Sequence, residues 1–378
     1  MEKDRYEDHF DFMKQALELA RKGLGEVEPN PAVGCVLVRK GTVIGRGWHE
    51  RFGGPHAEIN ALADCRKQGH TPEGAVMYVT LEPCTHVGKT PPCCKAIIEA
   101  GIQRVVIASE DPTPLAGGGI RQLSEAGIEV HTGLCRQEAE MLNAPFYKHA
   151  RTGLPWIILK WAQSIDGKLA WKSMHGKRWI SGEKSRQKVH HLRKKVQGIL
   201  TGVDTVIADN PDLTVRLQDV RVERPPLRIV LDSRLRIPAE SHLLTKTDAP
   251  TLVVTTQETA QSAQNRIASL KKAGIEVLTV PQQHGRCDLK NTLSQLGQRG
   301  IQQLLVEAGP HLIGQFLAHQ LADEVCIFIA PLILGTDGTA ELGLVLSQTA
   351  GYQTLQAVQI EQFDSDICIS ATLQTHPF

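Results

Sequence analysis

The chain has 378 residues, a length at which a single hydrophobic core usually gives way to two domains. Its 42 basic and 41 acidic side chains leave a net charge of +1, which argues against a nucleic-acid partner because such partners select a basic surface. The start, MEKDRYEDHF, lacks the apolar core of a signal peptide, and no apolar run is long enough to span a bilayer. We therefore expect a cytoplasmic protein with no membrane partner.

Helix and strand patterns alternate in the first half of the chain. A helix before Gly25, two strands around a turn at Lys40 and Gly41, and a helix over 57–67 come first. They are followed by a strand over 75–82, a short helix from 93, a strand over 104–109, and helices up to Gly127 and over 138–146. The pattern predicts a sheet covered by helices. It breaks at Gly153, so we place the domain boundary at about residue 150, giving domains 1–150 and 151–378.

The second half alternates again. Strands are expected over 156–162, 198–202, 228–232, 251–256, 275–280, 302–309 and 324–331, with helices over 183–196, 258–273, 288–298 and 310–319. Strands separated by helices predict a largely parallel sheet with both faces covered. The segment QQHGRCD at 282–288 is interpreted as an ordinary loop.

The cysteines need an account of their own. Nine of them, an odd number, are scattered through a chain without a signal peptide, which argues against a disulfide framework. Most, such as Cys35 and Cys326, are expected to be small buried hydrophobic residues. The stretch EPCTHVGKTPPCCK at 82–95 is different, because it places Cys84 and Cys93 nine residues apart among turn-forming residues.

A histidine and a carboxylate complete a metal-binding pattern with these two thiols. His56 and Glu58 stand at the start of the expected helix over 57–67, and Cys93 follows two prolines that suit a first helical turn. One imidazole and two thiolates are good zinc ligands, and three protein ligands leave a fourth position for water, as in catalytic zinc sites. Zinc lowers the pKa of such a water to about 7, and Glu58 is placed to shuttle its proton to a leaving amine.

Other readings of these residues stay open at this point. The first alternative to a catalytic zinc ion is a zinc ion that only stabilises the first domain, or no metal ion at all. A zinc deaminase acting on another pyrimidine or on RNA, with a second half that lacks redox activity, is another. Cys94 points about 100° away from Cys93 on the same helix, so it is interpreted as a packing residue.

The chain resembles the bifunctional riboflavin-biosynthesis deaminase/reductase family over nearly its whole length. In the first half the resemblance rests on NPAVG, GWH, PHAE, LEPCTHVGKTPPC, AGIQRVV and EDPTP. In the second half it rests on LKWAQSIDGKLA, TGVDTVIADNPDLTVR, RIVLDS, LLVEAGP and IAPLILG. The nine-residue spacing of the two thiols separates this family from cytidine and tRNA deaminases.

The resemblance implies a fold and a function for each half. It implies an α/β chain in which a cytidine-deaminase-like three-layer domain precedes a dihydrofolate-reductase-like α/β domain. The first would use zinc to remove the 2-amino group of 2,5-diamino-6-ribosylamino-4-pyrimidinone 5'-phosphate by hydrolysis. The second would use NADPH to reduce the ribosyl chain to ribityl. The partners are thus a small pyrimidine nucleotide and a second copy of the chain, in a dimer or tetramer.

The resemblance also assigns residues. Glu58 is catalytic, and His56, Cys84 and Cys93 hold the metal. For the substrate it implies Asn30, His49, His86, Lys160, Lys177, Arg193, Leu213, Arg216 and Glu307. For the cofactor it implies Ala162, Trp179, Thr205, Asp209, Ser233, Gly309, Pro310, His311, Leu312, Ile313, Gly314 and Gln315.

Several of these assignments have a plain structural alternative. Asn30 is also suited to cap the turn before a proline, and Arg216 to form a surface salt bridge. Lys160 and Glu307 are candidates near the reacting carbon, but a buried ion pair that only shapes the pocket explains them equally well. Lys177 stands in a segment one residue longer than is usual in the family.

Overall fold

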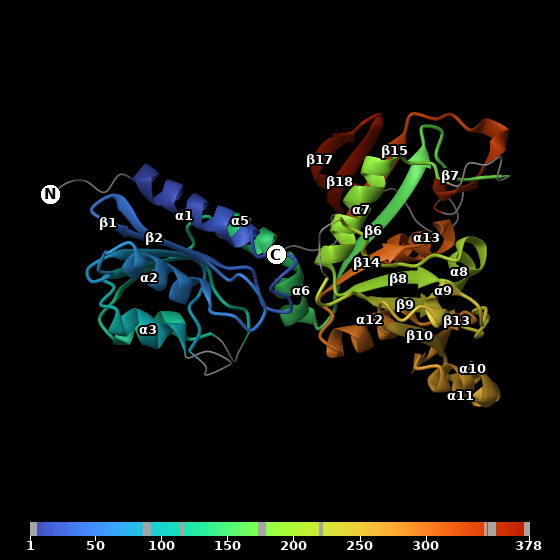
Figure 1. Cartoon of the computed structure of the whole chain (residues 1–378), viewed down its shortest axis with the longest axis horizontal. Coiled ribbons are helices and arrows are strands. Elements are labelled where there is room, and N and C mark those ends of the chain that lie inside the picture. The colour runs from blue at the N-terminus through green and yellow to red at the C-terminus, as the bar shows by residue number, and fades with distance from the viewer. Residues whose placement is uncertain are drawn as a thin grey trace. The chain divides into compact units, whose positions relative to one another are not determined.

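The computed structural model describes residues 6–85, 92–113, 117–172, 179–218, 222–343, 346 and 353–373. The chain divides into two compact units, Met1–Gly153 and Leu154–Phe378 (Figure 1). Within the described residues, no helix is both long and apolar enough to cross a membrane.

The first unit is an α/β sandwich of three layers. Its elements are α1 (Tyr6–Arg21), β1 (Gly34–Arg39), β2 (Thr42–Trp48), α2 (Ala57–Lys67), β3 (Val76–Leu81), α3 (Cys93–Glu99), β4 (Arg104–Ser109), α4 (Gly119–Glu125), β5 (Glu129–Thr132), α5 (Arg136–Leu142) and α6 (Ala144–Thr152). The strands lie in the order β2-β1-β3-β4-β5, antiparallel around β1 and parallel from β3 to β5. Figure 1 shows α1 and α5 on one face and α2 and α3 on the other.

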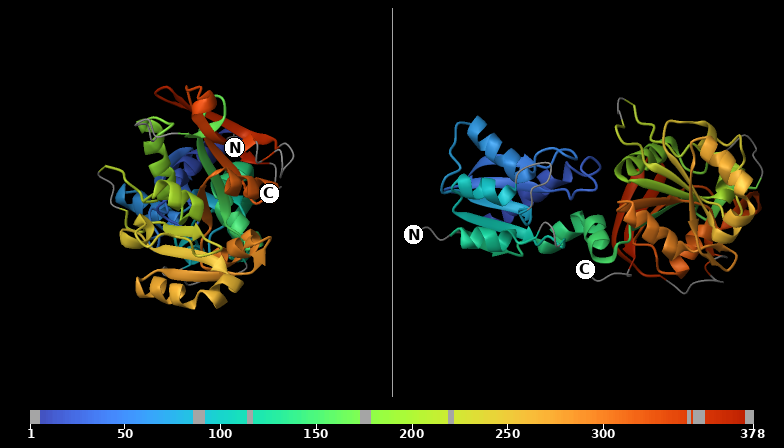
Figure 2. Two further views of the ribbon diagram at one scale, coloured as in Figure 1. Left: turned by 90° about the vertical axis from the view of Figure 1, so that its right-hand side faces the viewer. Right: turned by 90° about the horizontal axis from the view of Figure 1, so that it is seen from below.

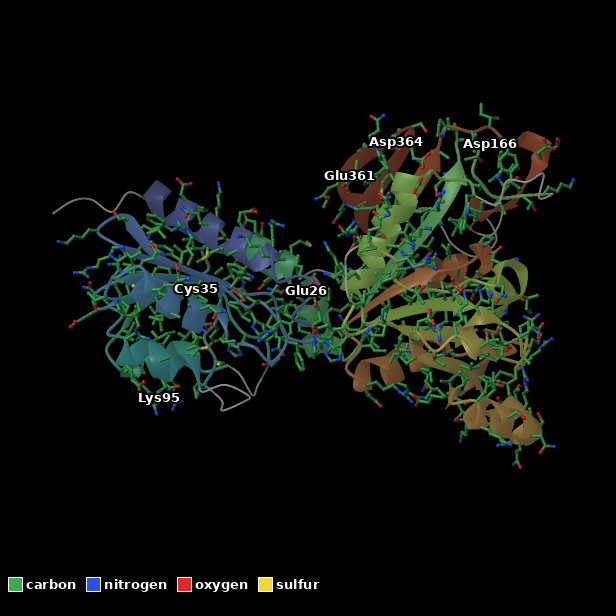
Figure 3. The ribbon with its side chains drawn as sticks, in the orientation of Figure 1. Glu26, Cys35, Lys95, Asp166, Glu361 and Asp364 are labelled. Carbon is green, nitrogen blue, oxygen red and sulfur yellow. The ribbon has the colours of Figure 1, made fainter. Side chains whose placement is uncertain are left out.

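The helices of the first unit are amphipathic, and this is why they settle on the sheet. In α1 the buried residues Met13, Ala16, Leu17 and Ala20 recur at helical spacing and pack on one face of the strands. On the opposite face α2, α3 and α4 enclose a second cluster, which includes Cys35 of β1 (Figure 3). Both faces of the central strands are therefore buried.

The second unit is built on one long sheet. Its elements are β6 (Trp156–Ser164), β7 (Lys168–Trp171), α7 (Glu183–Lys195), β8 (Gly198–Gly202), α8 (Val203–Asp209), β9 (Leu227–Leu231), α9 (His242–Thr245), β10 (Thr251–Thr256), α10 (Gln257–Ser262), α11 (Gln264–Lys272), β11 (Glu276–Val280), β12 (Gln282–Gln283), β13 (Arg286–Cys287), α12 (Leu289–Gln298), β14 (Gln303–Glu307), α13 (Pro310–Ala318), β15 (Glu324–Ala330), η1 (Gly335–Asp337), β16 (Gly338–Glu341), β17 (Leu355–Phe363) and β18 (Asp366–Leu373). The described strands of the long sheet follow the order β11-β10-β9-β8-β14-β6-β15-β18-β17.

This sheet is parallel from β11 to β15, as the alternating pattern predicts, and its last two strands are antiparallel. Figure 2 shows helices on both of its faces. Side chains of α12 and α13 pack on the face formed by Ile157, Leu159, Leu304 and Val306. The opposite face carries Lys160 and Glu307, which α7 covers.

The β17–β18 hairpin is a feature that the sequence analysis missed. Figure 3 shows Glu361 and Asp364 on it, and these pair with Lys188 (2.8 Å) and Lys184 (2.5 Å) of α7. The buried carboxylate of Asp366 accepts hydrogen bonds from the backbone N–H of Gly182 and from a serine hydroxyl in the first turn of α7. The hairpin thus fixes the start of α7.

Three sequence-based expectations about elements are wrong. The helix expected over 138–146 is two helices that meet at Asn143, and the second runs on to Thr152. Asn143 sits there because its side-chain amide exchanges two hydrogen bonds with the backbone of Ala32. The helix expected over 258–273 is divided at Ala263 into α10 and α11. The expected loop at 282–288 contains the short β12–β13 hairpin.

Candidate functional site

Three potential metal ligands meet in the first unit. His56 directly precedes α2 in an extended conformation, Cys84 follows β3, and Cys93 begins α3. The imidazole Nδ1 of His56 lies 3.2 Å from the sulfur of Cys93 and 3.6 Å from that of Cys84. One ligand atom from each residue lies within 4.8 Å of the other two. This spacing lets all three atoms bind a single ion.

The electrostatics of the two thiols favour a thiolate. The pKa of Cys84 is lowered to about 4, because the Cys93 thiol donates a hydrogen bond to its sulfur and His56 lies beside it. The backbone N–H of Cys93 also points at this sulfur, 3.4 Å away. Thiolate, not thiol, is the species that binds zinc. The donor set therefore fits the tetrahedral chemistry of zinc, with two sulfurs and one imidazole nitrogen.

Glu58 lies next to this group without belonging to it. Its side chain, in the first turn of α2, is only 3 % exposed and interacts with the Cys93 thiol. Burial raises its pKa above the usual value for a glutamate, and the nearby His56 opposes that shift. A carboxyl group with a raised pKa takes up a proton more readily than an exposed one, which suits a general acid–base residue.

Asn30 and His49 form a hydrogen-bonded pair beside the candidate metal ligands. The Nδ1 of buried His49 lies 2.9 Å from the carbonyl oxygen of Pro55, and its Nε2 lies 3.2 Å from the amide nitrogen of Asn30. A carbonyl only accepts, so Nδ1 donates and Nε2 accepts from Asn30. Burial lowers the pKa of His49, and its ring packs edge-on against His56. His86, the other predicted substrate residue here, lies outside the described residues.

Glu82 is a residue to which the sequence analysis gave no role. Its buried carboxylate accepts hydrogen bonds from the backbone N–H groups of Asp111, Gly118 and Ile120. These bonds join the β4–α4 loop and the first turn of α4 to the turn that carries Cys84. A glutamate directly before Pro83 and Cys84 is the signal that could have found it.

A large cavity marks the second unit. It has a volume of 1210 Å³ and is lined by residues at the carboxyl ends of β6, β8, β9 and β14. Ligands of parallel α/β sheets bind at this edge, because the loops there are free to vary while the strands stay fixed. Gly309, in extended conformation, caps the N-terminus of α13 at the cavity wall and leaves its backbone amides open to an anion.

Most of the predicted cofactor and substrate residues line this cavity. They are Lys160, Ala162, Trp179, Arg193, Thr205, Asp209, Leu213, Arg216, Ser233, Glu307, Gly309, Pro310, His311, Leu312 and Gln315. Ile313 and Gly314 do not, because both are buried in the opposite side of α13, and Ile313 belongs to the core of the unit. Lys177 lies outside the described residues.

A buried network of charges occupies the middle of the cavity wall. The guanidinium of Arg193, in α7, donates two hydrogen bonds of 2.6 and 3.0 Å to the carboxylate of Glu307. The ammonium of Lys160 lies 3.9 Å from the same carboxylate. Burial raises the pKa of Glu307, but the charges of Arg193 and Lys160 outweigh burial and leave it below the usual value. Burial lowers the pKa of Lys160. The expected Lys160–Glu307 pair is present, with Arg193 as the stronger partner.

Arg216 and His190 lie at the same wall. Arg216 is about half exposed and binds the carboxylate of Asp212 at 3.0 Å. The surface salt bridge expected as the alternative to substrate binding is therefore present. Its backbone N–H donates to Nδ1 of His190 at 3.2 Å. Burial, followed by the charges of Arg193 and Arg216, lowers the pKa of His190 to about 4. His190 is therefore neutral at physiological pH.

The β12–β13 hairpin is the second feature of the site that the sequence analysis missed. Residues 283–287 line the cavity, and the backbone N–H of Cys287 donates to the Ser233 hydroxyl at 2.9 Å. Two strands of two residues each give too short an alternation to be read from sequence.

Two family models match the chain, one to each unit. The cytidine and deoxycytidylate deaminase zinc-binding region matches residues 6–109, and the RibD C-terminal domain matches residues 155–369. Among curated relatives, riboflavin biosynthesis protein RibD of Aquifex aeolicus is 45% identical over 325 residues, 86% of this chain and 87% of the relative. The RibD of Bacillus amyloliquefaciens is 42% identical over 367 residues, 95% of each.

Solved structures agree over almost the whole chain. Acinetobacter baumannii RibD, form 1, is 35% identical with a TM-score of 0.83, covering 97% of this chain and 99% of that one. A diaminohydroxyphosphoribosylaminopyrimidine deaminase/5-amino-6-(5-phosphoribosylamino)uracil reductase from Thermotoga maritima has the same identity and coverage and a TM-score of 0.81. The expected fold is confirmed, a cytidine-deaminase-like domain followed by the dihydrofolate-reductase-like domain of this family. The chain therefore belongs to the RibD family of riboflavin biosynthesis proteins and is a bifunctional enzyme, a deaminase and a reductase.

Proposed function

We propose that the first unit deaminates 2,5-diamino-6-ribosylamino-4-pyrimidinone 5'-phosphate with zinc, and that the second reduces the ribosyl chain of the product with NADPH. The deaminase half of the proposal rests on one observation. His56, Cys84 and Cys93 meet beside Glu58, a buried carboxylate that is not one of the three candidate metal ligands. Three ligands and a free acid suit hydrolysis, whereas a structural zinc site is closed by four protein ligands.

In this proposal His56, Cys84 and Cys93 hold the zinc, which supplies an activated water as the nucleophile. Glu58 takes up a proton at its carboxylate and passes it to the departing amino group, as its raised pKa allows. Asn30 holds the pyrimidine ring, and His49 fixes the orientation of the Asn30 amide through its Nε2. His86 completes the substrate contacts.

The reductase half is supported by the cavity at the carboxyl edge of the long sheet. Its size suits a dinucleotide together with a pyrimidine nucleotide. The N-terminus of α13, at Gly309 and Pro310, faces the cofactor pyrophosphate. Lys160 and Glu307 lie beside the reacting sugar carbon, and Arg216 exchanges Asp212 for the 5'-phosphate of the substrate. The enzyme holds the two ligands in register for hydride transfer.

One assay separates the two activities. The purified protein is given the diaminopyrimidine nucleotide with and without NADPH, and its zinc content is measured. We expect ammonia release in both reactions and NADPH oxidation only after ammonia has been released. Ammonia release without any NADPH oxidation contradicts the reductase half, and a protein that lacks zinc but still deaminates contradicts the metal assignment.

A further inference from the structure

The turn that carries Cys84 is held on one side by α3. The backbone N–H of Cys94 donates to the carbonyl oxygen of Cys84 at 3.3 Å, and the backbone N–H of Cys93 points at the Cys84 sulfur. The buried thiol of Cys94 donates to the carbonyl oxygen of Pro83 at 3.3 Å. The first turn of α3 therefore carries Cys93 and contacts the turn that carries Cys84.

On its other side the turn is held by the β4–α4 segment, residues 110–120, of which the structure describes 110–113 and 117–120. The link is the carboxylate of Glu82, which is only 7 % exposed. Its Oε1 accepts the backbone N–H groups of Gly118 and Ile120 at 3.0 Å, and its Oε2 accepts that of Asp111 at 3.1 Å. Hydrogen bonds to an ionised acceptor are about twice as strong as neutral ones, so this side chain joins the two segments firmly.

The β4–α4 segment also packs tightly against the turn. A Cβ at Gly119, the first residue of α4, would lie 2.0 Å from the carbonyl oxygen of Pro83. The Thr85 hydroxyl donates to the carbonyl oxygen of Gly117 at 3.2 Å. The segment therefore contacts the residues directly before and directly after Cys84, and a displacement of the segment would move the Cys84 sulfur.

We propose that Glu82 is a positioning residue of the deaminase. Its carboxylate fixes the turn to the β4–α4 segment, and this keeps the Cys84 sulfur at the distance from Cys93 and His56 that lets all three bind one ion. The inference rests on the proposed zinc site and adds to it a residue that does not bind the metal. Replacing residues that orient metal ligands in this way typically costs about 10- to 100-fold in metal affinity.

The test is the variant Glu82→Gln in the full-length, zinc-loaded enzyme. Glutamine has nearly the same shape, but its amide has one acceptor oxygen, so in either orientation its NH2 group faces at least one of the three backbone N–H groups. Titration with a chromophoric chelator measures the zinc affinity, which should fall by about 10- to 100-fold. Deamination should fall at limiting zinc and recover at saturating zinc, because a bound ion itself holds the sulfur in place.

The matched control is Glu140→Gln. Glu140 is also 7 % exposed, but it lies in α5, on the opposite face of the sheet from α2 and α3, and binds the guanidinium of Arg136 at 2.9 Å (Figure 1). This variant should lower the stability of the first unit to urea and leave the zinc affinity at the wild-type value. Thr85→Val removes only the hydrogen bond to Gly117, and should weaken zinc binding by a smaller factor than Glu82→Gln does.

Wild-type zinc affinity in Glu82→Gln, or an equal loss of affinity in Glu140→Gln, overturns the inference and leaves the proposed zinc site standing. If urea unfolding shows that the first unit of Glu82→Gln does not fold, Thr85→Val decides, and an unchanged zinc affinity in that variant overturns the inference. A wild-type enzyme that binds no zinc overturns the proposed zinc site itself.

Discussion

Glu58 is a carboxylate that the fold buries beside two thiols, and burial favours its protonated form. Taking a carboxylate out of water costs stability, so an apolar side chain would serve a purely structural role at this position at least as well. Glu58 stands in the first turn of α2, two residues after His56, which explains how it reaches the candidate metal group without joining it.

We predict that Glu58→Gln keeps zinc and loses deamination. Glutamine has nearly the same shape but cannot carry a proton, so turnover should fall by about a hundredfold to ten-thousandfold. Ammonia release and metal content are measured on the same protein, and reduction of the deaminated substrate serves as the control. Full turnover in the variant would show that the zinc site is only structural.

His190 gives the second unit a dependence on pH. Its pKa is about 4 in the folded state and about 6.5 in an unfolded chain. Between these values the unfolded chain binds a proton that the folded one does not. The stability that neutral His190 contributes is therefore fully present above about pH 6.5 and is lost as the pH falls toward about 4.

We predict that His190→Gln makes the second unit less sensitive to acid. Because the ring is only half buried, the difference in pH-dependent stability between wild type and variant should be about 1–2 kcal/mol between pH 7 and pH 4.5, less than the full pKa shift implies. Urea unfolding followed by tryptophan fluorescence at the two pH values measures it. Parallel losses in both proteins would show that His190 is protonated in the folded state.

At the scale of elements, close packing of α2 on β2 places both His56 and Glu58. Gly47 of β2 faces the backbone of α2 directly, and a Cβ there would lie 2.3 Å from the nitrogen of Ala61 and 2.4 Å from the oxygen of Ala57. Such contacts cannot be relieved by turning a side chain. The position of α2 therefore requires that residue 47 has no Cβ atom, and so does the distance between Glu58 and the candidate metal ligands.

We predict that Gly47→Ala impairs deamination by about ten- to hundredfold, because it pushes α2 away from the sheet. Unfolding free energy should fall by about 1–3 kcal/mol. Ammonia release and denaturant unfolding measure the two effects. Reductase activity of the same protein should stay at the wild-type level, and a decrease there would mean that the damage is not confined to the first unit.

Elements with a strong periodic pattern were predictable from sequence, and those fixed by distant contacts were not. The helix over 57–67 and the strand over 251–256, for example, have the bounds that the sequence predicted. The division of the helices at Asn143 depends on hydrogen bonds to Ala32, more than a hundred residues away. In the candidate metal site, the types of side chain and their order along the chain pointed to His56, Cys84 and Cys93. Glu82 stands directly before Pro83 and Cys84, but its role could not be read from that position, because the backbone amides that it binds come together only after folding.

At the scale of the molecule, the two proposed activities use different units with separate cores. Within the described residues, the group of metal-ligating side chains found in the structure belongs wholly to the first unit. The cavity belongs wholly to the second. The expected dimer or tetramer stays a prediction.

We predict that removing metal with a chelator abolishes deamination and leaves reduction unchanged. The reason is that the reductase cavity is lined by charged and hydrogen-bonding groups of the chain itself. Ammonia release and NADPH oxidation with the deaminated substrate are followed before and after treatment, and added zinc should restore the first activity. If both activities disappear and both return with zinc, the metal has a role in the second unit as well.

The position of β6 in the long sheet has a consequence for the order in which a ribosome can deliver a folded enzyme. The sheet of the first unit draws its strands from residues 34–132, so it can form as soon as that stretch emerges. By contrast β6 lies between β14 and β15, which are synthesised more than a hundred residues later. Pairings this distant along the chain form slowly. We expect the deaminase unit of a nascent chain to be folded before β6, the strand that carries Lys160, can pair with β14 and β15.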